Sequence, residues 1–146
     1  MSLLIGEYLH SLDEKKRISL PKNFRAALGR KVIITRGLDN CLYIYSHASW
    51  ARIATKLQSL SIVNADTRGF SRFMLSGAAE VEVDTVGRIL IPDHQKSYAD
   101  LKKNVIFTGV SDRVEVWNAD RWNAYKKKID EQAERMATKL GEIGAL

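Results

Sequence analysis

A nine-residue motif occurs twice in this chain, and the duplication constrains the fold more than any other feature of the sequence. Residues 13–21 read DEKKRISLP and residues 84–92 read DTVGRILIP, so Asp, Arg, Ile and Pro recur at a constant spacing of 71 residues, from 13 to 84. The likeness continues, because VIIT at 32–35 resembles VIFT at 105–108. Two copies of one supersecondary unit predict internal pseudo-two-fold symmetry. Such symmetry suits matched contacts with a repetitive partner.

Each copy predicts the same order of elements: a β-hairpin, a short helix and a second β-hairpin. The tetrapeptide 13–16 separates two strand-like runs and is typical of a hairpin loop. In the second copy Glu80 and Glu82 alternate with two valines, the period of a half-buried strand. The elements predicted for the first copy are strands at 8–12 and 17–20, a helix at 22–28 that ends at Gly29, and strands at 32–35 and 41–45. Those predicted for the second copy are strands on either side of 84–87 and strands at 105–108 and 114–117.

The fourth residue of the loop differs between the two copies. Gly87 suits a position that needs a positive φ, which costs glycine nothing. Lys16 occupies the same place in the first copy. Either the first turn has a different shape, or Lys16 adopts a left-handed conformation at a cost of about 1 kcal/mol.

Amphipathic helices follow each copy. Apolar residues at three- and four-residue steps predict one buried face for each helical segment. After the first copy these residues are Trp50, Ile53, Leu57, Leu60, Phe70, Phe73 and Met74; after the second they are Trp122, Tyr125 and Ile129. We expect Trp50 and Trp122 to be packing anchors, Asn118 to cap the last helix, and residues 131–146 to fray. The sequence is therefore divided into a first repeat at 4–48, connecting helices at 49–76, a second repeat at 77–120, and a C-terminal helix and tail at 121–146.

The positive charge is concentrated in the first copy. The whole chain carries a formal charge of +6 over 146 residues, which alone is weak support for a nucleic-acid partner. Residues 13–31 hold seven cations and two anions, whereas residues 84–103 hold four cations and three anions. A basic patch of this kind is typical of a phosphate-binding face. It is also typical of a solvated surface loop, and charge alone leaves both interpretations open.

No arrangement of residues in the sequence predicts catalysis, a cofactor or a metal site. There is no glycine-rich phosphate loop, dinucleotide fingerprint or nucleophile elbow. The three histidines lie far apart without cysteine partners. A carboxylate beside an arginine has a lowered pKa and is a poor proton shuttle at neutral pH. We therefore expect Asp13 and Asp84 to accept backbone hydrogen bonds in their turns.

The remaining signals describe a protein of the cytoplasm. No apolar run approaches the ~20 residues that span a bilayer, and the N-terminus lacks the pattern of a secretory signal. Cys41 is the single cysteine, which excludes a disulfide within the chain. It lies in an apolar run, where we expect a small buried side chain.

The duplicated motif resembles the MraZ family of bacterial transcriptional regulators, which consist of two SpoVT/AbrB-like halves. The resemblance rests on Asp-x-x-x-Arg followed by a strand that ends in Pro, given twice with amphipathic helices after each copy, and covers about Leu4 to Met136. One departure is visible: the family usually has Lys-Gly before the first arginine, and this chain has Lys15-Lys16. The resemblance implies a mixed α+β, mainly β fold, a pseudo-two-fold AbrB-like β-barrel of interleaved, swapped hairpins flanked by helices.

The resemblance also implies a function. It implies a repressor of the division and cell-wall gene cluster that binds double-stranded DNA at short direct repeats upstream of its own operon, assembles into a homo-oligomeric ring and is associated with the nucleoid. It assigns Arg17 and Arg88 to DNA, and the basic cluster adds further candidates. The candidate DNA-binding residues are Lys15, Lys16, Arg17, Lys22, Arg25 and Arg88. The unequal local charges predict that the first repeat makes most phosphate contacts and that the second is mainly structural.

Two other classes of function remain open. One is a protein-interaction or scaffold ring whose basic hairpins bind an acidic partner. The other is an enzyme, for which no nucleophile, base and pocket occur together. RNA binding would be a variant of the DNA-binding interpretation, but the sequence has no RNP-type aromatic motif.

Overall fold

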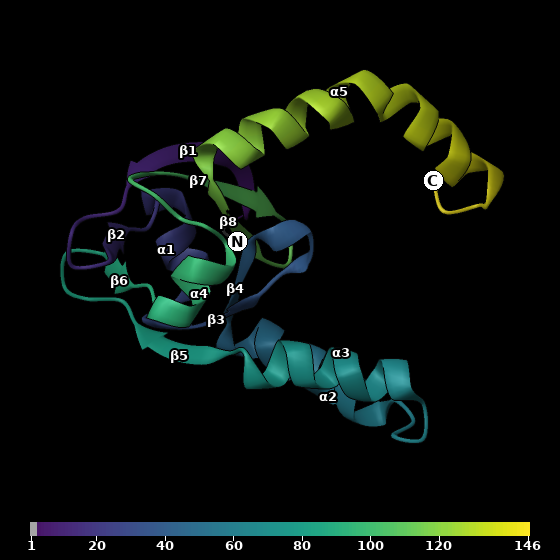
Figure 1. Ribbon diagram of the computed structural model, residues 1–146, viewed down its shortest axis with the longest axis horizontal. Coiled ribbons are helices and arrows are strands. Elements are labelled where there is room, and N and C mark those ends of the chain that lie inside the picture. Colours follow the sequence, from purple (N-terminus) through teal and green to yellow (C-terminus); the bar gives the residue numbers. More distant parts are fainter. Residues whose placement is uncertain (1–2) are drawn as a thin grey trace.

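The computed structural model describes residues 3–146 as a mixed α+β fold (Figure 1). The first repeat contains β1 (Ile5–Ser11), β2 (Arg17–Ser19), α1 (Lys22–Leu28), β3 (Lys31–Arg36), η1 (Leu38–Asn40) and β4 (Leu42–Ser46). The second repeat contains β5 (Ala79–Glu82), β6 (Arg88–Leu90), α4 (Asp93–Tyr98), β7 (Asn104–Val110) and β8 (Val114–Asn118). Between and after the repeats lie α2 (His47–Ser59), α3 (Ala65–Ser76) and α5 (Ala119–Glu142). The order of strands and helices predicted from the duplication is confirmed.

The strands of the two repeats interleave. All strands pair antiparallel, in a six-stranded sheet of order β1-β7-β8-β4-β3-β5 and a two-stranded sheet of β2 and β6. The six-stranded order is symmetric about its β8–β4 centre, as the duplication predicts. Each repeat contributes its first strand to the edge of the other repeat's hairpin, since β1 pairs with β7 and β5 pairs with β3.

The prediction that 13–16 and 84–87 each close a β-hairpin is wrong. The turns are tight, but the strands on their two sides have different partners. The backbone N–H of Leu12 donates to Lys103 O at 2.8 Å, and that of Val83 donates to Arg30 O at 2.8 Å. These bonds continue the pairing with the opposite repeat up to the turn, and the chain then enters the β2–β6 pair.

The predicted closed barrel is also not formed. Within residues 3–146, β1 and β5 are edge strands of an open sheet, each paired on one side only. A closed barrel would require β1 and β5 to be paired on both sides. The strands β2 and β6 instead pair with each other as a separate ribbon.

The four central strands of the six-stranded sheet, β3, β4, β7 and β8, are buried on both faces. Along β4, Leu42 and Ile44 belong to a core shared with the β2–β6 ribbon, α1 and α4, whereas Tyr43 and Tyr45 belong to a second core beneath the long helices. This alternation follows from the two-residue period of a strand. The ribbon and the long helices therefore lie on opposite sides of the sheet.

The long helices are anchored by their aromatic residues. Trp50 packs on Tyr45 with a ring separation of 5.7 Å, and Trp122 packs on Trp117 at 5.3 Å, so their prediction as packing anchors is confirmed. The side chain of Asn118 accepts from the N–H of Arg121, which confirms the predicted N-cap. The predicted fraying of 131–146 is wrong for 131–142, because α5 continues as a helix to Glu142 and extends away from the sheet (Figure 1). Residues 143–146 lie beyond the helix.

Candidate nucleic-acid interface

The β2–β6 ribbon brings the two motif arginines onto one surface. Ile18 lies opposite Ile89 at the centre of the ribbon, and both side chains are 1% exposed. Since side chains alternate along a strand, the neighbours of these isoleucines face away from the core. The outward-facing residues are Arg17 and Ser19 on β2 and Arg88 and Leu90 on β6. Arg17 lies opposite Leu90 and Arg88 opposite Ser19, so one arginine occupies each end of the ribbon.

Each turn that leads into the ribbon is held by its aspartate. The Oδ1 atom of Asp13 accepts the backbone N–H groups of Lys15 and Arg17 at 2.8 and 2.9 Å. Asp84 repeats these contacts with Val86 and Arg88 at 3.0 and 2.8 Å. The expectation that both carboxylates accept backbone hydrogen bonds is confirmed. The backbone N–H of Arg88, together with its side chain, holds the pKa of Asp84 below its usual range.

The two turns have the same backbone shape and bond to the opposite repeat. Lys16 has φ 62° and Gly87 has φ 85°, so Lys16 adopts the left-handed conformation in place of glycine. The carbonyl of Gly87 accepts from Leu20 N at 2.9 Å, and the carbonyl of Lys16 accepts from Ile91 N at 2.9 Å. These reciprocal bonds fix the position of each turn relative to the other repeat's strand.

Three of the predicted DNA-binding residues are held by contacts within the protein. The Nζ atom of Lys16 forms an ion pair with Asp93 at the start of α4, and this pair lowers the pKa of the Asp93 carboxyl. Arg25 is partly buried, and its Nε donates to Leu20 O at 3.0 Å. The Nε of Arg88 lies 3.0 Å from Oδ2 of Asp84.

The other three predicted residues are available to a partner. Arg17, Lys15 and Lys22 are exposed, and among residues 3–146 none has a carboxylate within ion-pair distance. Arg17 therefore presents its guanidinium from the ribbon without an internal anion, in contrast to Arg88.

Sequence reasoning missed part of this surface. Ser19 and Leu90 share the outward face with the arginines, and Leu90 is 48% exposed. Knowledge that β2 pairs with β6 would have identified both residues, because the register of this pair places them on the same outward face as the two arginines. Three lysines of the second repeat, Lys96, Lys102 and Lys103, lie beside the first turn. They were missed because the pairing of the first strand with the opposite repeat brings them there.

The described residues contain no sign of a metal centre or a membrane span. Within 3–146, no three His, Cys, Asp or Glu side chains are grouped so as to hold a metal ion. No helix in this part of the chain combines the length and the apolar character needed to cross a bilayer. Cys41 is buried in the second core, as predicted, and burial raises the pKa of its thiol.

The fold and this surface define a class: duplicated α+β proteins whose two halves interleave and jointly present an arginine-bearing β-ribbon. Comparison with known proteins gives the family. The model of the family described as "MraZ protein, putative antitoxin-like" matches residues 3–73 and again 74–140. The chain belongs to the MraZ family.

Relatives of this family match almost the whole chain. A protein of Acetivibrio thermocellus named "Transcriptional regulator MraZ" is 48% identical over 142 residues, which is 97% of this chain and 99% of the relative. Proteins of the same name from Caldanaerobacter subterraneus and Moorella thermoacetica are 47% and 46% identical, each over 94% of this chain and 96% of the relative.

Proposed function

We propose that this protein is a sequence-specific DNA-binding transcriptional regulator whose β2–β6 ribbon enters the major groove. The observation that carries the proposal is the ribbon itself, two short antiparallel strands with Ile18 and Ile89 turned inward and an arginine at each end facing out. The major groove is about 12 Å wide and admits a two-stranded β-ribbon. Paired strands lie about 4.8 Å apart, so the ribbon and its side chains fit that width. The names of the relatives support the same function.

Within this proposal Arg17 reads a base edge. Its guanidinium offers a planar fork of donors that matches O6 and N7 of guanine. Among residues 3–146, no carboxylate lies within ion-pair distance of it. Arg88 makes the lesser contact, because Asp84 already binds its Nε. Lys15 and Lys22 contact phosphates.

Substitution of Arg17 tests this assignment. Arg17→Ala is expected to weaken operator binding by about 1–3 kcal/mol, or about 5- to 150-fold, and to relax sequence preference. Arg17→Lys keeps the charge but loses the fork, so it should retain affinity for scrambled duplex while losing preference for the operator. Arg52→Ala is the matched control, because Arg52 is an exposed helical arginine whose side chain, within residues 3–146, bonds only to Ser49. Fluorescence anisotropy measures the affinity of the three variants for the operator and for the scrambled duplex. An Arg17→Ala protein that folds and binds the operator with unchanged affinity contradicts the assignment.

The proposed operator is a set of short direct repeats upstream of the protein's own operon, where binding represses the division and cell-wall genes. The support is the resemblance of the duplicated motif to the family. Several subunits on tandem boxes would bind with avidity, because linked sites raise the effective concentration. Affinity should therefore rise steeply with the number of boxes in the probe. An acidic competitor protein that displaces the DNA completely would favour the scaffold alternative.

We also propose that the protein assembles into a homo-oligomeric ring and acts at the nucleoid in the cytoplasm. The ring is supported by the apolar surface of the helical segment 47–76, where Ile62 and Val63 are 79% and 85% exposed and Phe70 is 41% exposed. Head-to-tail contacts that close generate rings. Analytical ultracentrifugation at tens of micromolar should show a species larger than a dimer, and Ile62→Asp should reduce its size. A monomer of the unchanged protein at that concentration contradicts the ring.

A further inference from the structure

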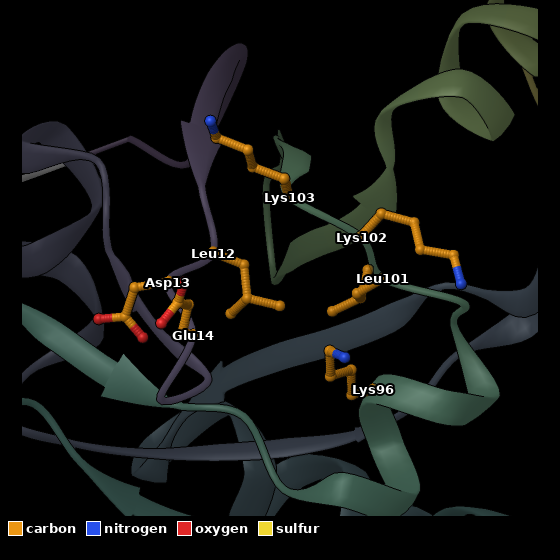
Figure 2. Close-up of a pocket in the computed structure, with 7 residues that line it drawn as sticks. All are labelled: Leu12, Asp13, Glu14, Lys96, Leu101, Lys102 and Lys103. Carbon is orange, nitrogen blue, oxygen red and sulfur yellow. The ribbon is translucent and has the colours of Figure 1, made fainter.

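Two grooves lie beside the turns of the ribbon, and the sequence duplication relates them. The first groove, about 470 Å³, runs between the 13–14 turn and three lysines of the second repeat (Figure 2). Leu12 and Leu101 lie between the acidic turn and these lysines, which are Lys96, Lys102 and Lys103. The second groove, about 360 Å³, lies between the 84–87 turn and two arginines of the first repeat, Arg25 and Arg30.

Corresponding residues line the two grooves. Asp13 and Asp84 hold the same place in the motif, and Lys96 in α4 corresponds to Arg25 in α1 at the same spacing of 71 residues. Each groove is also lined by cations that follow its short helix, Lys102 and Lys103 after α4 and Arg30 after α1. Because the strands interleave, each groove combines the turn of one repeat with cations of the other.

This regrouping equalises the charge of the two groove linings. The residues that line the first groove include three lysines and two carboxylates, and those that line the second include two arginines and one carboxylate, so each lining sums to one positive charge. Lys102 in the first groove also pairs with Asp100, which lies outside the lining, at 3.1 Å. The excess in residues 13–31 is reduced within the fold, since Lys16 pairs with Asp93 and Lys31 lies 3.9 Å from Glu82. The unequal charges along the sequence therefore do not produce unequal charges in the linings of the two grooves.

We propose that both grooves bind the sugar-phosphate backbone of duplex DNA, so that the two repeats make phosphate contacts to a similar extent. The inference rests on the proposed function. Since β2 and β6 are antiparallel, their turns lie at opposite ends of the ribbon, and each groove adjoins one turn. In the first groove, the buried Leu12 and Leu101 offer an apolar base to deoxyribose, and the lysine ammonium groups at the rim offer charge to phosphates. In the second groove Val83 and Ala26 form the apolar part, and the guanidinium groups supply the charge. The Asp13 carboxylate already accepts two backbone N–H groups, which reduces its repulsion of an anion.

The salt dependence of DNA binding tests the proposal, because each phosphate contact contributes about 0.9 to the log–log slope. The probe is a scrambled duplex of about 30 base pairs, chosen because phosphate contacts do not depend on sequence. In the full-length protein, K102Q/K103Q should lower the slope by about 1.8 and R30Q by about 0.9. The matched control, K127Q/K128Q on exposed positions of α5, changes the charge equally and should leave the slope unchanged.

The possible outcomes separate the grooves from the proposed function. A slope that stays equal to that of the control, either for K102Q/K103Q or for R30Q, overturns the proposal. K103Q alone is the second variant, since Lys102 pairs with Asp100 at 3.1 Å and its loss could affect folding. If the grooves fail while the unchanged protein still prefers its operator over the scrambled duplex, the proposed function stands. If the unchanged protein binds no duplex at low salt, the proposed function itself is wrong.

Discussion

Replacement of Gly87 by Ala should destabilise the ribbon through two separate effects. Gly87 is buried in the second turn with φ 85°, and a methyl group built there overlaps the guanidinium of Arg25. Arg25 in turn donates a 3.0 Å hydrogen bond to Leu20 O, which ties α1 to the end of β2. The substitution therefore strains the backbone and displaces Arg25 from its acceptor.

The expected magnitude follows from these contacts. Left-handed backbone costs a residue with a side chain about 1 kcal/mol. Loss of a hydrogen bond to a charged donor costs about 1.5 kcal/mol, the lower end of the usual range because Arg25 is only partly buried. The reduced entropy of the unfolded chain returns about 0.5 kcal/mol. The free energy of unfolding should fall by about 2 kcal/mol, which lowers Tm by about 6 °C for a chain of this size.

A double-mutant cycle with Arg25→Ala measures the contact by urea unfolding. In the unchanged protein Gly87→Ala should cost about 2 kcal/mol, and in the Arg25→Ala background about 0.5 kcal/mol, because the overlapping side chain is absent and only the net strain remains. Lys16→Ala is the control for a turn residue that is already left-handed, and it should change stability little through its backbone. Equal costs of Gly87→Ala in the two backgrounds would refute the role of Arg25.

Two further predictions concern groups with shifted pKa values. The pKa of Asp84 is lowered, so its charged form stabilises the fold above the ordinary value of 3.8, and this stabilisation is lost as the pH falls below that value. Asp84→Asn should therefore make Tm decline less between about pH 4 and pH 2. A Tm that declines equally in both proteins over this range would contradict the prediction. Burial raises the pKa of the Cys41 thiol, so iodoacetamide at pH 8 should leave the folded protein unmodified and alkylate it in urea, as mass spectrometry would detect; rapid modification of the folded protein would place Cys41 at the surface instead.

Local signals were sufficient to predict most elements of this fold. The helix at 22–28 ends at Gly29 as predicted, and the aspartates hold their turns through backbone N–H groups four or fewer residues away. The second hairpin of each repeat also forms as predicted, from β3 and β4 and from β7 and β8. The strands on either side of the motif turns instead pair with partners far along the chain, and there the prediction was wrong. A short polar loop between two apolar runs looks the same in sequence whether its strands pair with each other or, as here, with the opposite repeat.

The candidate site was predicted by residue but not by arrangement. Duplication identified Arg17 and Arg88, whereas only the β2–β6 register shows that they share one ribbon face. Charge alone also selected Lys16 and Arg25, and both are engaged by contacts within the protein. A count of cations along the chain cannot distinguish an available side chain from one that stabilises the fold.

The first turn shows how interleaving compensates a local departure from the repeat. Lys16 replaces the glycine found at position 87, and its side chain extends to Asp93 on the opposite repeat. In the first copy Lys22 corresponds to Asp93, and in the second copy Gly87 corresponds to Lys16. The second turn therefore has no lysine that would need a carboxylate at position 22. Arg25 occupies the space beside Gly87, so a side chain fits the first turn but not the second. Asp93, which pairs with the lysine that replaces glycine in the first turn, therefore comes from the other half of the chain. The two turns must be interpreted together with the helices that face them.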